Sequence, residues 1–313
     1  MATPTATLAY DRTVSRALVH RWALSEVFLT DSVATGEDTF TAAAQLPLSH
    51  AHYRDHEPGR ASHDALLVLE SCRQAVTYAS HLHEDVPRDT TFMVTSWTLD
   101  ITGPEALRCA DRPGELRMDA EVTARARRGG RLRRLAFAMD LVLDGRPLGR
   151  LTMDINCTPT DQYHALRHMQ RGTTVPTAFT LPALPDGTPV DPARVRRLDP
   201  ANAVLDAAHL APDALTALLS PRTFGNRSMY DHPYDHVPAM VFSEAARQCA
   251  LLLDPERGTA RVLRLHGRFL KFAELDEEVR LTAVPEEGGG PGEFRMTAVQ
   301  QDETVAEVRV ALG

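Results

Sequence analysis

Lysine is almost absent from this sequence of 313 residues: Lys271 is the one example, and the rest of the 34 Lys and Arg residues are arginine. The formal net charge is −8. A general nucleic-acid binder needs an excess of cations to displace counterions from phosphates, so this composition argues against that class. Any phosphate site in this chain must be built from arginine or histidine, and the planar fork of arginine binds phosphate bidentately.

Cysteine is also scarce, and the four examples lie far apart with no Cys-x-x-Cys pair: Cys72, Cys109, Cys157 and Cys249. This spacing indicates neither a zinc site nor a disulfide framework, and it favours a reduced, cytoplasmic location. No run of about 18 apolar residues occurs, so we expect no membrane-spanning helix. The segment "MATPTATLAYDRTVSRA" lacks the charged-then-apolar order of a secretory signal.

A phrase of the form Glu-x-x-Arg-Gln occurs twice in the chain. It is part of "ESCRQA" and of "EAARQC", and its three residues recur at one constant separation. A histidine precedes each copy, His56 in the first and His232 in the second. A repeat this long indicates a duplicated domain rather than a solenoid unit. The repeated residues are Glu70, Arg73 and Gln74 in the first half and Glu244, Arg247 and Gln248 in the second.

Each half contains a strand region, one helix and then several alternating segments typical of antiparallel strands. The helices are expected at about residues 65–82 and 239–253. In the first half, "RRGGR" between two alternating segments predicts a hairpin with positive φ at Gly129 and Gly130. One helix cannot cover a sheet of this size, so we expect the two copies to form one continuous surface with a helix per half. The pattern predicts an α+β fold.

Proline is concentrated between the two halves, at positions 159, 176, 182, 185, 189 and 192. This density predicts a linker, with one short helix near residues 162–168. We therefore divide the chain into an N-terminal domain at residues 15–157, a proline-rich linker at 158–196 and a C-terminal domain at 197–313.

Glu70 and Arg73 are three residues apart, so they share a helix face. Almost every neighbour in this helix is apolar, which predicts burial, and buried charges are costly unless they are paired or used. A single pair of this kind is more often structural than functional. Because the pair occurs twice and each copy follows a histidine, we favour a functional site, although duplication alone also copies a structural pair.

The histidine and the acid together resemble the active-site motif of the hot-dog-fold hydroxyacyl-ACP dehydratases. His56 is followed by Pro58–Gly59 and then, on the expected helix, by Glu70. In those enzymes the histidine and the acid of one site come from different hot-dog units, which implies the pairs His56 with Glu244 and His232 with Glu70. The second copy departs from the motif, with a shorter spacing from histidine to glutamate and no glycine in "HPYD". Arginine also replaces a small residue of the dehydratase helix, which favours a phosphorylated or anionic small molecule.

The whole chain resembles the A-factor biosynthesis family, the tandem (double) hot-dog synthases of γ-butyrolactone and butenolide signals. The resemblance covers about residues 15–313 and rests on "VHRWALSEVFLTD", "FTAAAQLPLSHAHY", "DALLVLESCRQA", the proline-rich middle and "SEAARQCA". It implies two antiparallel sheets that each wrap one long helix. It also implies an acyltransferase that moves a β-ketoacyl group from acyl carrier protein to a hydroxyl of dihydroxyacetone phosphate, after which the ester condenses to a butenolide phosphate.

That reaction gives the repeated residues roles. A glutamate would take the proton from the attacking hydroxyl, with a pKa raised by its apolar helix. An arginine would hold the phosphate, and backbone N–H groups at a helix start would hold the thioester oxyanion. We expect no cofactor, and either a monomer or a homodimer. The candidates are Glu244, Glu70, His56 and His232 for catalysis, Arg247 and Arg73 for the phosphate, Gln74 and Gln248 as support, and the N–H groups near Ala65 and Ala239.

Two other chemistries are less favoured. Cys72 and Cys249 flank the acids but occupy different positions in the repeat, which argues against an acyl-thiol intermediate. The histidines around Asp55 and in "YDHPYDH" lack a known metal-ligand spacing, so we interpret them as polar active-site loops and expect no metal. They are His50, His52, His56, His63, His232 and His236.

The segment "ARARRGGRLRR" concentrates positive charge at the expected hairpin. It is either a solvated hairpin tip or a docking surface for acidic acyl carrier protein, and the sequence leaves both interpretations open. Its candidate docking residues are Arg125, Arg127, Arg128 and Arg131, followed by Arg133 and Arg134.

Two rival functions remain open at this point. One is a hot-dog hydroxyacyl-thioester dehydratase or thioesterase, against which the arginine of each helix counts. The other is a non-catalytic module that binds an acyl chain or a lactone. The sequence indicates neither the acyl chain length nor whether one or both sites work.

Overall fold

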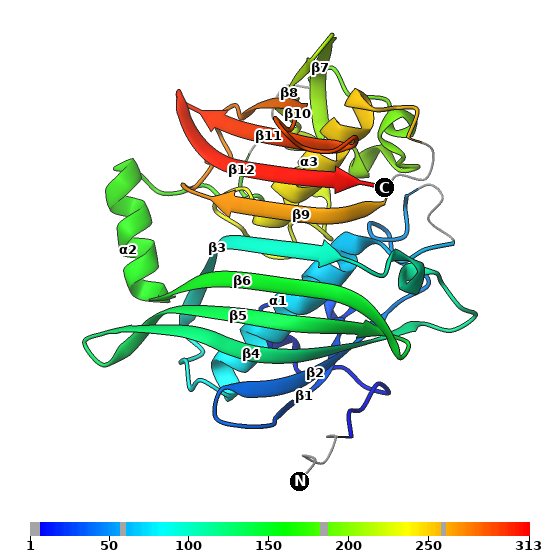
Figure 1. Ribbon diagram of the computed structural model, residues 1–313. Helices are drawn as coiled ribbons and strands as arrows, with labels where there is room; N and C mark the ends of the chain where they lie inside the picture. The colour runs from blue at the N-terminus through cyan, green and yellow to red at the C-terminus, as the bar shows by residue number, and fades with distance from the viewer. Residues whose placement is uncertain (1–6, 57–60, 182–186, 258–260) are drawn as a thin grey trace.

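The computed structural model describes residues 7–56, 61–181, 187–257 and 261–313. Its strands form one twelve-stranded sheet (Figure 1), which every β-strand assigned in those ranges joins. The first half contributes β1 (Leu29–Ala34), β2 (Thr39–Leu46), β3 (Thr90–Ile101), β4 (Gly114–Arg128), β5 (Arg131–Leu143) and β6 (Arg146–Pro159). The second half contributes β7 (Leu205–Ala211), β8 (Ala214–Leu219), β9 (Val262–Phe269), β10 (Arg280–Pro285), β11 (Glu293–Gln300) and β12 (Glu303–Leu312).

The strand order repeats from one half to the other. Across the sheet it is β1-β2-β4-β5-β6-β3 and then β9-β12-β11-β10-β8-β7, so each strand of the first half has a counterpart at the mirrored place. Neighbouring strands are antiparallel, and the tip between β4 and β5 carries Gly129 and Gly130 with φ of 59° and 77°. The predicted hairpin, the α+β class and the tandem hot-dog architecture are confirmed, and the two predicted sheets are joined edge to edge.

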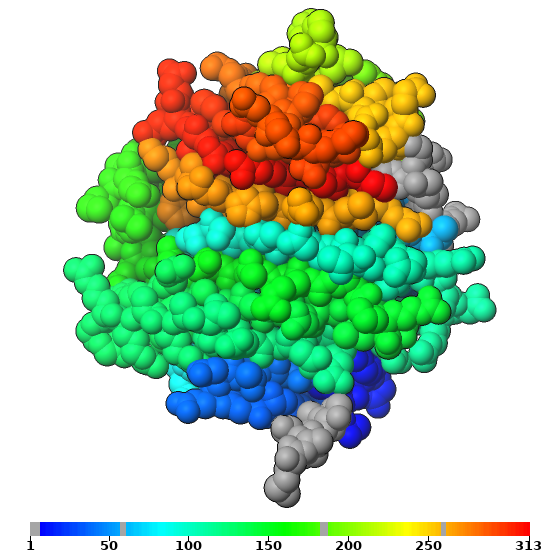
Figure 2. Space-filling model, viewed as in Figure 1, coloured from blue at the N-terminus to red at the C-terminus, as the bar shows by residue number. Residues whose placement is uncertain are grey.

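The seam between the halves is the antiparallel pair β3–β9, in which Trp97 lies opposite Gly267. A Cβ at position 267 would lie 2.8 Å from Nε1 of Trp97 and 2.7 Å from the ring of Phe269. Glycine therefore allows the indole to pack across the seam, with the rings of Trp97 and Phe269 5.0 Å apart. The bands of β3 and β9 lie against each other without a gap on the outer face (Figure 2).

Each half-sheet wraps one helix, α1 (Ala65–Leu82) in the first half and α3 (Ala239–Leu253) in the second (Figure 1). Both helices agree with the ranges predicted from the sequence. Nearly all of their residues are buried, because each helix has the sheet on one side and loops or the other helix on the remaining sides. No helix in the described ranges has both the length and the apolar character needed to cross a membrane.

The segment between the halves forms a third helix, α2 (Thr160–Arg171), which extends the short helix predicted near residues 162–168. It begins where β6 ends and stops at Gly172, whose φ of 68° gives the left-handed conformation of a helix C-terminus. Arg167 of α2 is buried and binds both carboxylate oxygens of Glu274, at 2.7 and 2.8 Å. This ion pair fixes α2 against the segment that follows β9.

The loop before each helix reaches across to the other half. Asp55, which precedes α1, accepts hydrogen bonds from the backbone N–H groups of residues 198–199 at 3.0 to 3.2 Å. Asp231, which precedes α3, accepts from the N–H groups of residues 22–23 at 2.6 and 3.0 Å. These reciprocal contacts place side chains from both halves at the start of each helix.

Candidate active site

The first repeated glutamate lies at the centre of a buried cluster that we call the Glu70 cluster: Arg21, Glu70, Arg73 and Gln74. Glu70 is fully buried. Its Oε1 lies 2.6 Å from Nη2 of Arg21 and accepts from Gln74 at 2.7 Å. Arg73 binds both carboxylate oxygens at 2.8 Å. The carboxylate therefore carries two guanidinium groups and one amide, which satisfies its acceptors.

The second copy forms the Glu244 cluster: Arg197, Glu244, Arg247 and Gln248. Glu244 is also buried, and Arg247 binds its two oxygens at 2.9 and 2.7 Å. Arg197 binds the same oxygens at 3.0 and 2.8 Å, and Gln248 donates to Oε1. The two clusters share their composition and the bonds made by the helix arginine and the glutamine, but Arg21 binds only Oε1 of Glu70, whereas Arg197 binds both oxygens of Glu244.

The pKa values of both glutamates differ from the sequence-based expectation. Burial alone would raise the pKa of Glu70, but Arg21 and Arg73 outweigh burial and hold the pKa at about 2. Arg197 and Arg247 likewise outweigh burial and lower the pKa of Glu244. The predicted increase is wrong because the sequence pattern shows one arginine per glutamate and the structure supplies two. Carboxylates held in this way are weak proton acceptors, and they serve to fix the guanidinium groups.

The repeated glutamines link each cluster to the strand region before its helix. Gln74 donates to Glu70 and to the carbonyl oxygen of Glu26, and its own oxygen accepts from the N–H groups of residues 28–29. Gln248 makes the equivalent bonds to the carbonyl of Asn202 and from the N–H of Val204. The amides therefore have the supporting place that the repeat predicts for them.

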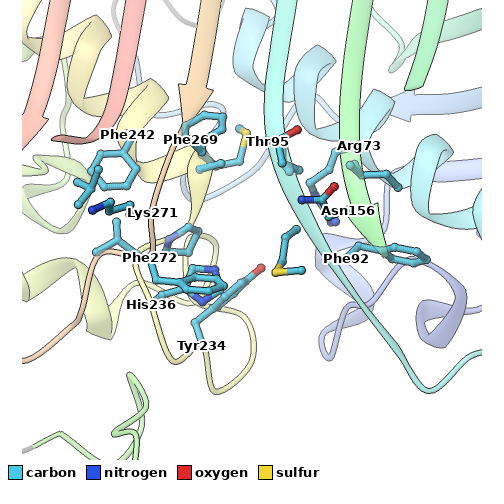
Figure 3. Close-up of a pocket in the computed structure, with 18 of the residues that line it drawn as sticks. Arg73, Phe92, Thr95, Asn156, Tyr234, His236, Phe242, Phe269, Lys271 and Phe272 are labelled. Carbon is cyan, nitrogen blue, oxygen red and sulfur yellow. The ribbon is translucent and has the colours of Figure 1, made fainter. Parts of the chain in front are cut away.

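A cavity of about 690 Å³ opens beside the Glu70 cluster and extends between the two halves (Figure 3). At one end it is lined by Arg21 and Arg73, and elsewhere by aromatic side chains together with polar and charged ones such as Arg167, Lys271 and Glu274. Among the described residues that line the cavity, none belongs to the Glu244 cluster. The side chain of Arg73 is 17% exposed, whereas that of Arg247 is 5% exposed. The aromatic part of the wall includes Phe92, Trp97, Phe242, Phe269 and Phe272.

One substitution within the repeat separates the two clusters electrostatically. Asp64 is the N-cap residue of α1, and Pro238, its counterpart in the repeat, is the N-cap residue of α3. Asp64 is buried, and the nearby His56, Arg247 and Arg197 outweigh that burial and lower its pKa. The Glu244 cluster therefore faces a second carboxylate, while the Glu70 cluster faces a proline at the equivalent place.

Of the other acids nearby, two are matched by the repeat and one, Glu26, belongs to the first half alone. Asp55 and Asp231 occupy mirrored places, so they affect both clusters alike. Glu26 has no acidic counterpart, since Asn202 stands at its mirrored place, but its carboxylate accepts from Ser228 at 3.0 Å and lies 3.2 Å from His50. The Glu70 cluster has one more guanidinium than carboxylate, and Asp64 removes that surplus at the Glu244 cluster.

The two loop histidines lie beside the arginines of the opposite half. His56 forms an isolated bridge with Arg197, and its Nδ1 is 3.8 Å from Asp64. Burial, more than the nearby Arg247, lowers the pKa of His56. Pro58 and Gly59, which carry part of the dehydratase-like motif, lie outside the described residues.

His232 lies in the same way near the Glu70 cluster. Its Nδ1 is 3.8 Å from Asp231, and its ring lies 3.9 Å from the ring of Tyr234. Burial lowers the pKa of His232, and Arg21 and Arg73 act in the same direction. The arrangement across the halves is the one that the resemblance implied for the histidines, although no hydrogen bond links either ring to a repeated glutamate within the described residues.

Arg21 and Arg197 are not among the residues predicted from the sequence for these clusters. Each lies far before its glutamate in the chain, so no local pattern joins them to it. A signal was nevertheless present, because the region before each helix also repeats, at a constant separation slightly longer than that of the helices. That separation pairs Arg21 with Arg197, Asp55 with Asp231 and His56 with His232.

The cysteines do not contribute to the cavity. Cys72 and Cys249 are buried, and burial raises the pKa of Cys249 to about 12 and that of Cys72 further. A thiol in this state is not a nucleophile at neutral pH. Within the described ranges, no group of three His, Cys, Asp or Glu residues is arranged to hold a metal ion.

The arginine hairpin divides into bound and exposed residues. Arg125 binds Glu84 at 2.6 and 2.7 Å and Asp38 at 2.5 Å, which makes it part of the scaffold. Arg127, Arg128 and Arg131 are exposed and make no ion pair within the part of the chain that the structure describes. A compact positive tip therefore remains at the end of the hairpin.

Two half-sheets that each wrap one helix, with an arginine-lined cavity between the halves, define a tandem hot-dog protein. The sequence also identifies the family of the chain. The family model described as the A-factor biosynthesis hotdog domain matches residues 3–159 and 164–312, and the chain belongs to that family.

Two curated relatives carry one name, 2-oxo-3-(phosphooxy)propyl 3-oxoalkanoate synthase. The protein from Streptomyces virginiae is 32% identical over 296 residues, which cover 94% of this chain and 95% of the relative. The protein from Streptomyces coelicolor is 29% identical and covers 93% of this chain and 89% of its own length. Among solved structures, a 12:0-ACP thioesterase from Umbellularia californica superimposes with a TM-score of 0.48 at 11% identity, over 89% of this chain and 98% of that chain.

Proposed function

We propose that this protein is an acyltransferase of γ-butyrolactone biosynthesis, the 2-oxo-3-(phosphooxy)propyl 3-oxoalkanoate synthase that its curated relatives are named for. It transfers a 3-oxoacyl group from a thioester to the hydroxyl of dihydroxyacetone phosphate. The resulting ester then condenses within itself to a butenolide phosphate. The observation that carries the proposal is the cavity, because a guanidinium group at one end and aromatic rings elsewhere suit a phosphate ester and an acyl chain together.

The phosphate is assigned to Arg73. Its side chain is the more exposed of the two repeated arginines and lines the cavity, while Glu70 fixes its guanidinium. Arg21 adds a second guanidinium to the same carboxylate, so the cluster keeps one uncompensated positive charge beside the cavity. A partly desolvated guanidinium fixed in this way binds phosphate strongly, because no further ordering is needed.

The acyl chain is assigned to the aromatic part of the cavity. Phe242 of α3 and Phe269 at the end of β9 line this wall, and Trp97 closes it at the seam. The volume of about 690 Å³ falls within the range of roughly 300 to 1,000 Å³ that is usual for ligand cavities. The thioester carbonyl then lies between the two parts, where the acyl chain and the triose phosphate meet.

The start of α3 is assigned to the thioester oxygen. Pro238 provides no side-chain cap, and Ala239 lines the cavity, so the helix N-terminus faces the substrate. The start of α1 differs, because Asp64 accepts a hydrogen bond from the N–H of Leu66 at 2.9 Å. An uncapped N-terminus supplies N–H donors and a positive end of the helix dipole to a developing oxyanion.

One of the two duplicated sites therefore carries the reaction. The Glu70 cluster has the cavity, the surplus positive charge and the uncapped helix opposite it. The Glu244 cluster has none of these features among the described residues, and we assign it to holding the two halves together through Arg197, whose Nη1 donates to the carbonyl of His52 at 2.6 Å. His56 belongs to this second cluster and has the same structural role.

Acyl carrier protein is the proposed donor, with the tip formed by Arg127, Arg128 and Arg131 as its docking surface. An acidic partner is attracted over a distance of about a Debye length by such a patch. Reversing Arg127 and Arg128 to glutamate should slow turnover of the carrier-protein thioester and leave turnover of a small thioester mimic unchanged. Equal slowing of both donors would contradict the docking role.

The function is tested by mass spectrometry of the products formed from a 3-oxoacyl thioester and dihydroxyacetone phosphate. We expect the ester of the acyl group with dihydroxyacetone phosphate, the butenolide phosphate formed from it by loss of water, and release of the free thiol. Dihydroxyacetone without phosphate should react poorly, because it offers nothing to Arg73. Hydrolysis of the thioester at the same rate with and without dihydroxyacetone phosphate would identify a thioesterase instead, and the absence of any turnover would leave a binding module.

A further inference from the structure

His236, in the loop before α3, forms a hydrogen-bonded pair with the neighbouring Asp235. Nδ1 of His236 lies 2.6 Å from Oδ1 of Asp235. The same oxygen accepts from the hydroxyl of Tyr163 at 2.6 Å, and Oδ2 accepts from Nε of Arg167 at 3.1 Å. Arg167 also donates to the backbone carbonyl of Asp235 at 2.9 Å. Three side chains and one backbone contact therefore fix this carboxylate.

The fixed carboxylate determines which nitrogen of the imidazole carries the proton. Burial would raise the pKa of Asp235, but His236, Tyr163 and Arg167 outweigh it and lower the pKa, so the group stays ionised. An ionised carboxylate accepts a hydrogen bond, which places the proton on Nδ1 of His236 and leaves Nε2 as an acceptor. Nε2 has no hydrogen-bond partner among the described residues.

The ring of His236 lines the same cavity as Arg73. The side chain is 25% exposed, and Figure 3 shows it with Tyr234 and Phe272 along the cavity wall. Its ring packs 5.0 Å from that of Phe272, which holds its plane. A histidine oriented by a buried carboxylate and open to a substrate cavity on its other side has the arrangement of a general base.

The other acids and histidines at or near the cavity are less suited to this role. Nδ1 of His52 is bonded to Asn202 and burial lowers the pKa of His52 to about 3, while Glu274 is bound by Arg167 and Arg171 and Glu303 by Lys271.

Glu70 is held by two guanidinium groups and has a pKa of about 2, so it is a poor proton acceptor at neutral pH. His232 is 3.8 Å from Asp231, whose oxygens already bind the N–H groups of residues 22–23. His232 is also absent from the described residues that line the cavity.

We propose that His236 is the catalytic residue that takes the proton from the attacking hydroxyl, and that Asp235 is the positioning residue that orients it; this rests on the proposed function. As the O–H proton moves to Nε2, the hydroxyl oxygen forms a bond to the thioester carbon and the carbonyl electron pair moves to its oxygen. The intermediate then collapses, the C–S bond breaks, and sulfur leaves with the electron pair and receives the proton from His236.

The test compares the wild-type protein with His236→Ala, His236→Gln, Asp235→Asn and, as a matched control, His168→Ala on the exposed face of α2. Ester formation is measured at varied dihydroxyacetone phosphate. We expect kcat of both His236 variants to fall by roughly 10²- to 10⁴-fold with KM within about twofold of wild type. Added imidazole should restore part of the activity of His236→Ala, because it enters the vacated space. Asp235→Asn should lower kcat less and leave KM unchanged, and the control should match the wild type.

The outcomes that contradict the role of His236 can be distinguished from those that contradict the proposed function. If the wild type forms the ester and His236→Ala keeps its kcat, the assignment of the base falls while the function stands. If KM rises while kcat is kept, so that kcat/KM falls only through KM, and imidazole restores nothing, His236 binds substrate and is not the base. If the wild type forms no ester, the proposed function fails and the assignment fails with it. Thermal melting of each variant checks that the fold is kept.

Discussion

The Glu70 and Glu244 clusters each consist of two arginines, a glutamate and a glutamine, yet among the described residues only the first cluster borders the cavity. The difference arises outside the repeated phrase. Asp64 supplies a carboxylate to the second cluster, and Pro238 supplies none to the first. A buried ion pair is thus present in both halves, and we propose that the residue at the start of the helix determines which copy keeps positive charge for a ligand.

The Glu244 cluster keeps its ion pairs for a physical reason. Arg197 is almost completely buried, and Glu244 is its partner. Removing one member of a buried pair leaves an unpaired charge and costs about 3 to 5 kcal/mol. The second cluster is therefore retained by stability, whether or not it binds anything.

The largest expected difference between the clusters concerns the two repeated arginines. Arg73→Gln should lower kcat/KM for dihydroxyacetone phosphate by roughly 10²- to 10³-fold, since a charge-assisted contact to the phosphate is lost. Arg247→Gln should lower the melting temperature and leave kcat/KM within a few fold of wild type. Steady-state kinetics and thermal melting of the two variants measure this contrast. Equal loss of kcat/KM in both would mean that both sites work.

An effect of intermediate size on the free energy of unfolding is expected at low pH. The pKa of Glu70 is about 2 in the fold against an ordinary value of 4.5, so its contribution to stability is complete above about pH 4.5 and is lost as the pH falls toward 2. The free energy of unfolding should decrease over this window by up to about 3 kcal/mol from this group. Chemical denaturation at several pH values measures the slope.

Glutamine variants assign that slope to the clusters. Glu70→Gln and Glu244→Gln should each destabilise the protein at neutral pH and flatten the acid slope, because the titrating group is gone. An unchanged slope in both variants would mean that other carboxylates control acid unfolding. Glu244→Gln is expected to keep measurable ester formation in the protein that remains folded, which separates its structural role from catalysis.

The smallest effect is expected when the residue before α3, beside the Glu70 cluster, is changed to the aspartate that stands before α1, beside the Glu244 cluster. Pro238→Asp places a carboxylate at the start of α3, where it caps the helix and offsets the surplus charge of the Glu70 cluster. We expect kcat/KM to fall by about tenfold while the melting temperature is kept or raised. Pro238→Asn is the matched control, because it caps without charge and should retain more activity. If both variants lose the same activity, geometry rather than charge distinguishes the sites.

Much of the fold could be predicted from the sequence because its signals are local or repeated. Helix burial follows from apolar residues on nearly all sides of residues 65–82, and the hairpin follows from Gly129 and Gly130. Because the domain is duplicated, the same elements are expected in the second half. The edge-to-edge seam was not predictable in detail, since it depends on Trp97 fitting over Gly267 from a strand in the other half of the chain.

The site was predictable in its repeated residues but not in its electrostatics. Glu70, Arg73 and Gln74 are brought together within one helix, so the sequence shows their proximity. Arg21 joins them from a distant segment and acts with Arg73 to lower the pKa of Glu70 against the effect of burial. The importance of His236 was also hidden, because Tyr163 and Arg167, which hold its partner Asp235, come from the segment between the halves.

Asp55 and Asp231 each accept hydrogen bonds from the backbone of the other half, so the two halves of the chain depend on each other for stability. Each half lacks, on its own, the acceptor that holds the backbone directly after its buried arginine. A fragment comprising either half alone would expose a charged interior and a free sheet edge at β3 or β9. The duplicated chain is thus expected to fold as one unit, in which both halves supply walls of the cavity described above.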